Sequence, residues 1–131
     1  MREIGRTLPE FQAFHRELDA VKEFDTDFLT NMVLLTEEVG ELAREIFRVR
    51  RFSTEFAKEC PPEEAYARAL EIQSKKIGAE LADCLAYIFK LANNAGVDLD
   101  LDALSKDMSD PATYALLGRG EGVVDRAERG A

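Results

Sequence analysis

Two pairs of acidic residues have the spacing that a metal site requires. Glu38 and Glu41 are three residues apart, and Glu80 and Asp83 repeat this arrangement later in the chain. Residues three apart share one face of a helix, so each pair can converge on one ion. If the two helices pack antiparallel, the four carboxylates surround a common space. Their mutual repulsion then favours a hard divalent cation such as Mg²⁺, with Mn²⁺ as a substitute.

A solvated helix flank is the competing interpretation of these pairs. The chain has 26 acidic residues, so pairs at this spacing also arise by chance. Both pairs border apolar stripes of long predicted helices, and the pattern alone leaves the two interpretations open. A di-iron bundle is disfavoured, because that design uses Glu-x-x-His motifs. The single histidine, His15, has Gln12 at the required position.

Other polar residues extend the two acidic stripes. Asn31 precedes Glu38 by seven residues and either reaches a substrate or forms a polar flank. Gly40 lies inside the first acidic pair, where glycine costs up to about 1 kcal/mol relative to alanine. A close backbone or ligand approach would explain this glycine. The second stripe, on the face of Glu80, adds two cations, a phenol and an amide: Lys76, Lys90, Tyr87 and Asn94.

Two further groups of residues have a simple interpretation that we prefer. Three arginines suit the C-terminal end of a helix, where cations are favourable, and phosphate binding is the minor alternative: Arg48, Arg50 and Arg51. Aromatic side chains near the N-terminus have helical spacing, which favours core packing over a wall that stacks on a base: Phe11, Phe14, His15, Phe24 and Phe28.

Helices must position these residues, and their start signals are clear. The run Thr7-Leu8-Pro9-Glu10 has the form of a capping box and predicts a first helix from Thr7. A second helix follows Asp25-Thr26-Asp27. Its apolar residues repeat at spacings of four and three, which predicts a core-facing seam: Phe28, Met32, Leu35, Val39, Leu42, Ile46 and Val49.

The second half of the chain continues this helical pattern. Pro61-Pro62 begins a third helix that runs to Ala95, with Gly96 as its terminator, and a short fourth helix covers 101–108. We therefore predict an all-α bundle of three main helices plus a short fourth. The domain spans 1–117, and 118–131 form a flexible tail. Self-association as a homodimer or homotetramer completes the core.

Composition excludes several classes of protein. The 131 residues carry a net charge of −9, which argues against nucleic-acid binding, because that depends on a basic surface. No apolar run is long enough to cross a bilayer, and no secretory signal precedes the first helix. The two cysteines, Cys60 and Cys84, are too few for a disulfide scaffold, which favours the cytoplasm.

The acidic motifs resemble the signature of the all-α nucleoside triphosphate pyrophosphatases, the MazG-like superfamily. Its pattern Glu-Glu-x-x-Glu, a spacer and Glu-x-x-Asp is matched by Glu37-Glu38-x-x-Glu41 and Glu80-x-x-Asp83. The downstream runs Val97-Asp98-Leu99 and Leu104-Ser105-Lys106 are similar to the dCTP pyrophosphatase branch. Tyr87 and Tyr114 also match positions of that branch.

The resemblance implies a Mg²⁺-dependent hydrolysis of a nucleoside triphosphate to the monophosphate and pyrophosphate. It implies metal ligation by the motif acids Glu38, Glu41, Glu80 and Asp83, and a role for Glu37 with the attacking water. Substrate contacts would come from Lys106 and Tyr114, with Tyr87, Lys76 and Asn31 as further candidates. The chain has no tryptophan, whereas the dCTP branch uses tryptophans around its base.

Two other functions compete with this one. A related phosphoanhydride such as phosphoribosyl-ATP is the alternative substrate within the superfamily. A catalytically inert helical adaptor that dimerises through its seams is the alternative from a different class, because helical bundles host many functions.

Overall fold

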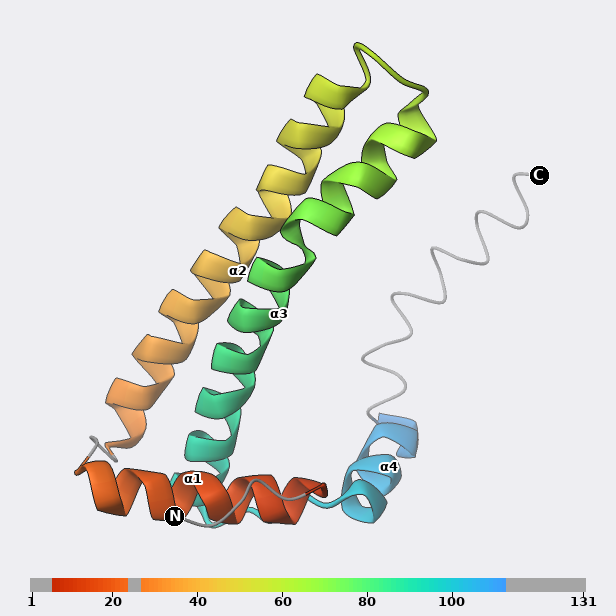
Figure 1. The fold of residues 1–131 in the computed structure, drawn as a ribbon. Coiled ribbons are helices and arrows are strands. Elements are labelled where there is room, and N and C mark those ends of the chain that lie inside the picture. The colour runs from red at the N-terminus through yellow and green to blue at the C-terminus, as the bar shows by residue number, and fades with distance from the viewer. Residues whose placement is uncertain (1–5, 24–26, 113–131) are drawn as a thin grey trace.

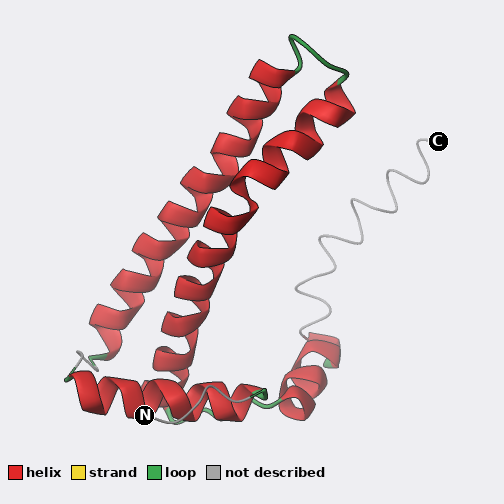
Figure 2. Cartoon of the chain, in the orientation of Figure 1, coloured by secondary structure: helices red, strands yellow, loops and turns green. Residues whose placement is uncertain are grey.

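The computed structural model describes residues 6–23 and 27–112. Its helices are α1 (Leu8–Lys22), α2 (Phe28–Phe56), α3 (Pro62–Ala95) and α4 (Leu101–Ser109). The described ranges contain these four helices and no strand (Figure 2), which confirms the predicted all-α fold with three main helices and a short fourth. The predicted boundary after 117 and the tail 118–131 lie outside the described residues.

A long antiparallel hairpin of α2 and α3 forms most of the molecule (Figure 1). α1 crosses the open end of this hairpin and packs against α3, and α4 lies at the same end, outside the hairpin. Within the described ranges, none of these helices is long and apolar enough to cross a membrane. The hairpin therefore holds the two acidic motifs, and α1 closes one of its ends.

The helix ends follow the predicted start and stop signals. The Thr7 hydroxyl accepts from the backbone N–H of Glu10, whose carboxylate accepts in return from the Thr7 backbone, so the predicted capping box is present. Asp27 caps α2 by accepting from the Thr30 backbone N–H at 2.8 Å. Gly96 ends α3 in the left-handed conformation with φ of 66°, which glycine adopts without strain.

The side chains between α2 and α3 differ from the predicted ones. The hairpin interior contains small and polar residues that are at most 8 % exposed: Asn31, Glu45, Val49, Ala65, Ala69, Gln73 and Cys84. The predicted seam is instead half exposed, at 49–51 %, in Phe28, Met32, Val39 and Ile46. The seam and the acidic stripe are adjacent along α2, so a rotation of about 100°, one residue, exchanges them. The prediction that the seam is buried within the chain is therefore wrong for these four residues, whereas Val49 is buried as predicted and Leu35 and Leu42 are partly buried.

Many of the exposed apolar residues of α2 and α3 fall on one side of the hairpin by their helical spacing, whereas Leu29, Val33 and Phe47 of α2 do not. A groove of about 340 Å³ on that side contains Ile46 of α2 together with Tyr66, Leu70 and Ile77 of α3. We call this side the apolar flank, and its further members include Phe28, Met32, Val39, Leu81, Leu85 and Ile88.

α1 is tied to the C-terminal half of α3 by aromatic and polar contacts. The Phe11 and His15 rings stack on Phe89, with centroids 6.0 and 5.5 Å away, and Phe14 is buried beside them. The buried Gln12 amide donates to the Val97 carbonyl at 2.7 Å. Phe14 is core, and Phe11 and His15 are partly buried against Phe89, which agrees with the preferred interpretation, whereas Phe28 is half exposed. Phe24 lies outside the described residues.

The predicted end of the second helix at its arginines is wrong. The helix continues to Phe56, so Arg48, Arg50 and Arg51 lie within it and not at its end, and they need another explanation. A Cβ added at Gly40 would meet no atom of the described residues within 4 Å beyond its own helix backbone. The backbone approach expected at this glycine is therefore not found among the described residues, whereas the ligand approach stays a prediction.

Candidate metal site

Three acidic residues from the two motifs converge between α2 and α3. Glu38, Glu41 and Glu80 each place a carboxylate oxygen within 4.8 Å of the others. One oxygen of Glu38 and one of Glu80 are buried without a hydrogen-bond partner in the protein. Buried carboxylate oxygens cost free energy when unpaired, and a hard divalent cation with oxygen ligands satisfies them. The donor set therefore fits Mg²⁺.

The pKa values of the cluster reflect the same crowding. Burial is the largest cause that raises the pKa of Glu38 above its ordinary value, followed by the negative charges of Glu41, Asp83 and Glu80. Burial, followed by the charges of Glu41 and Asp83, raises the pKa of Glu80 in the same way. The cluster therefore resists carrying full negative charge without a cation.

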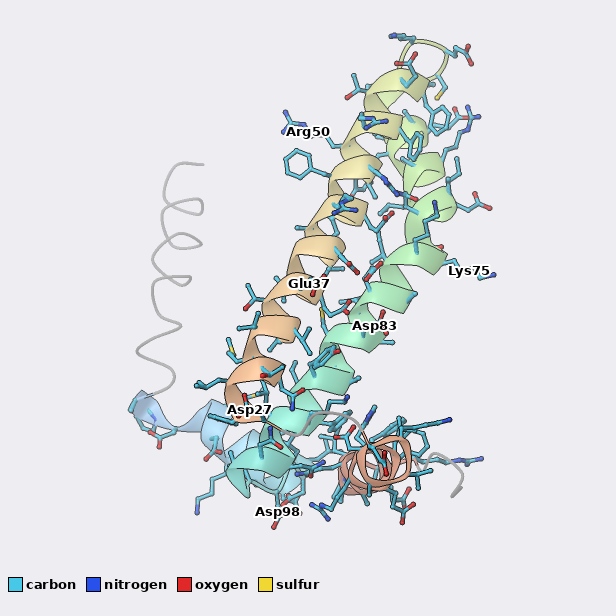
Figure 3. All side chains as sticks on the ribbon, turned by 90° about the vertical axis from the view of Figure 1, so that its left-hand side faces the viewer. Asp27, Glu37, Arg50, Lys75, Asp83 and Asp98 are labelled. Carbon is cyan, nitrogen blue, oxygen red and sulfur yellow. The ribbon has the colours of Figure 1, made fainter. Side chains whose placement is uncertain are left out.

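The remaining motif acids lie beside this cluster. Asp83 acts electrostatically on both Glu38 and Glu80, but it is exposed and outside the group of three converging carboxylates. Glu37 is also exposed, and its charge acts on the Tyr87 phenol. Figure 3 shows Glu37 on α2 and Asp83 on α3 in the central part of the hairpin.

A second acidic network lies one turn farther along α2. Glu45, which is 8 % exposed, accepts from the Gln73 amide at 3.1 Å and from the Arg48 guanidinium at 2.7 Å. Both carboxylate oxygens are thereby occupied. The sequence analysis missed this network, although the spacing of four and three from Glu41 to Glu45 and Arg48 continues the acidic stripe.

A third polar group joins the hairpin to α1. The Lys90 amine lies 3.1 Å from the Asp19 carboxylate, and both side chains are nearly buried. The same amine lies 5.1 Å from the centre of the Tyr87 ring. Burial, followed by the charge of Glu38, raises the pKa of Tyr87, which places this phenol under the influence of the acidic cluster. Lys90 was on the predicted stripe, but Asp19 carried no signal.

The other predicted substrate residues are dispersed. Asn31 is buried in the hairpin, on the same helix face as Glu38 and Glu45, and Lys76 is exposed on α3. Lys106 is exposed on α4, which does not pack extensively on the hairpin. Tyr114 lies outside the described residues.

Fold and site together define a class: a helical hairpin with a carboxylate cluster suited to a divalent cation. The profile of the MazG nucleotide pyrophosphohydrolase domain matches residues 26–106, and the chain belongs to this family. The match covers α2 and α3 and most of α4, whereas α1 precedes it. No curated protein and no solved structure was found to match the chain.

Proposed function

We propose that this protein is a Mg²⁺-dependent nucleoside triphosphate pyrophosphohydrolase, which converts a (d)NTP and water to the (d)NMP and diphosphate. The observation that carries the proposal is the convergence of Glu38, Glu41 and Glu80, with two buried oxygens that lack a protein partner. The family match supports a nucleotide phosphoanhydride as the substrate class.

The motif acids divide into two roles in this proposal. Glu38, Glu41 and Glu80 hold the cation, and Asp83 joins them when its exposed side chain turns inward. When bound there, Mg²⁺ supplies charge neutralisation of the triphosphate and lowers the pKa of bound water. Glu37 is exposed next to this group and accepts the proton of the water that attacks the α-phosphorus.

A dCTP-like or non-canonical nucleotide is the proposed substrate, with a role in cleaning the nucleotide pool in the cytoplasm. The support is the resemblance of the segment around Lys106 and Tyr114 to the dCTP pyrophosphatase branch. Tyr87 also matches a position of that branch, and it lies close enough to Glu38 for that charge to help raise the pKa of the phenol, after burial. Lys76 and Asn31 remain candidates for phosphate and sugar contacts.

The apolar flank supports self-association. Its half-exposed residues, such as Met32, Val39 and Ile46, form a continuous helical stripe on one side of the hairpin. Exposed apolar stripes of this kind mark interfaces. A second copy of the hairpin supplies a matching flank and would complete a four-helix bundle as a homodimer or as half of a homotetramer. Sedimentation velocity of the wild type and of Val39→Glu tests this assembly.

Pyrophosphate release from a panel of canonical and modified nucleoside triphosphates tests the function. Release with Mg²⁺, and none with EDTA, is the expected result, and the panel identifies the base. The matched variants Glu38→Gln and Glu17→Gln each remove one acid, one in the cluster and one on α1. We expect only Glu38→Gln to abolish release. A folded wild type that cleaves no nucleotide would contradict the proposal and favour the inert adaptor.

A further inference from the structure

The network around Glu45 holds one arginine in a fixed position beside the acidic cluster. Arg48 donates to one Glu45 oxygen at 2.7 Å, and Gln73 donates to the other at 3.1 Å and to the Glu45 carbonyl at 3.3 Å. Gln73 is 1 % exposed, so this anchor is part of the hairpin interior. A solvent-exposed arginine samples many rotamers, whereas this anchor restricts Arg48.

The hydrogen bond to Glu45 directs the Arg48 guanidinium along α2 toward the acidic cluster. Side chains of a helix tilt toward its N-terminus, and Arg48 reaches back by three residues to contact Glu45. Glu41 lies a further four residues back, which is one helical turn of about 5.4 Å. The charged end of Arg48 is thus closer to the cluster than its own backbone is.

Arg48 also has room to bind an anion. Its side chain is 37 % exposed and borders a cavity of about 550 Å³. A guanidinium carries five N–H donors, and the bond to Glu45 uses one of its nitrogens. Three other cations line this cavity: Arg44, Arg50 and Arg51. In a chain with a net charge of −9, this group of arginines is a local positive region.

We propose that Arg48 binds the pyrophosphoryl end of the nucleoside triphosphate, with Glu45 and Gln73 as its positioning residues. The inference rests on the proposed function. In that reaction the water oxygen bonds to the α-phosphorus, and the bond from this phosphorus to the bridging oxygen breaks. Its electron pair leaves with the pyrophosphate, so negative charge grows there. A guanidinium stays protonated and pairs with phosphate oxygens in a bidentate manner, without transferring a proton.

The pair Arg48→Gln and Lys75→Gln tests this role. Each variant removes one positive charge, but Lys75 is exposed on α3, projects outward from the hairpin (Figure 3) and does not line the arginine cavity. We expect Arg48→Gln to weaken binding of inorganic pyrophosphate, measured by calorimetry with Mg²⁺, by about tenfold or more, since a charge-assisted contact is lost. Lys75→Gln should change it by less than about twofold. Arg48→Lys keeps the charge without the planar fork and should give an intermediate loss.

A double-mutant cycle separates positioning from a structural role. Glu45→Gln removes the anchoring charge but keeps the side-chain shape, and we expect a smaller loss of pyrophosphate affinity than in Arg48→Gln. In the Arg48→Gln background, Glu45→Gln should weaken pyrophosphate binding no further, because the two residues act through one contact. Equal pyrophosphate affinity in Arg48→Gln and Lys75→Gln would overturn the inference. Absence of nucleotide cleavage by the wild type would instead contradict the proposed function.

Discussion

Glu41 and Glu45 lie one turn apart on α2 and both face α3, but their surroundings differ in how the carboxylate oxygens are hydrogen-bonded. Glu41 belongs to a cluster in which neighbouring carboxylate oxygens lack protein partners. Glu45 has both oxygens occupied, one by Gln73 and one by Arg48. The two regions share residue type, helix and orientation, so their difference lies in their partners alone. A carboxylate that has no hydrogen-bond donor in the protein is suited to binding a metal ion. A carboxylate whose oxygens both accept hydrogen bonds instead holds its donor side chains in place, as Glu45 does with Arg48 and Gln73.

The largest effect separates these two glutamates by activity. Glu41→Gln removes a proposed ligand, and we expect kcat/KM to fall by about 1000-fold or more, which is about 4 kcal/mol of transition-state stabilisation. The metal-free protein should not lose stability, because one of several repelling charges has gone. Pyrophosphate release and thermal denaturation in EDTA measure the two quantities. Wild-type turnover by Glu41→Gln would contradict the proposed role of the acidic cluster in catalysis.

Two buried glutamines, Gln73 beside Glu45 and Gln12 on α1, allow the role of Glu45 in binding to be separated from its role in stability. Gln73→Leu leaves a Glu45 oxygen without its donor, and Gln12→Leu leaves the Val97 carbonyl and the Leu99 N–H unpaired. Each should lower the free energy of unfolding by about 1–3 kcal/mol, measured with denaturant. Only Gln73→Leu should also weaken pyrophosphate binding, because Gln12 acts at α1. Equal effects of both variants on pyrophosphate binding would show that stability alone explains them.

The acidic cluster was predictable because its signal is local. Spacing along single helices paired Glu38 with Glu41, and one assumption about antiparallel packing brought Glu80 to them. Which stripe faces inward was not predictable in this way, since the apolar seam and the acidic stripe are adjacent on α2. A single chain buries the polar stripe and leaves Val39 half exposed. That choice depends on what covers the apolar flank.

The missed contacts are long-range. Gln73 reaches Glu45 from 28 residues away, and Asp19 reaches Lys90 from the separate helix α1. Neither pair has a periodicity that links its members, so only the crossing of the helices brings them together. The capping residues show the opposite case: Thr7 and Glu10 are three residues apart, and their capping box was predicted in full.

The acidic cluster should also make stability depend on pH. An acid in an ion pair makes the folded chain more stable as the pH rises, whereas Glu38 and Glu80 should make it less stable. The pKa values of Glu38 and Glu80 are raised above the ordinary value of 4.5 in the folded chain. The folded state therefore binds more protons than the unfolded state. The contribution of Glu38 and Glu80 to the free energy of unfolding is fully present below pH 4.5, and it is lost as the pH rises through their raised pKa values. Without metal, the melting temperature should fall across this window. Mg²⁺ should reduce the fall, and Glu38→Gln should flatten it.

The smallest effect concerns the outer side of α2. Gly40 follows Glu38 by two residues, so it is rotated from it by about 200° and faces away from α3. Because no atom lies within 4 Å of a Cβ added there, Gly40→Ala should raise the free energy of unfolding by about 0.5–1 kcal/mol. Gly78→Ala, equally open on α3, is the matched control. We expect KM for the nucleotide to stay unchanged in both variants. A raised KM in Gly40→Ala alone would show that the substrate binds against the outer side of α2. It would then not lie between α2 and α3, and the difference between Glu41 and Glu45 would not explain its binding.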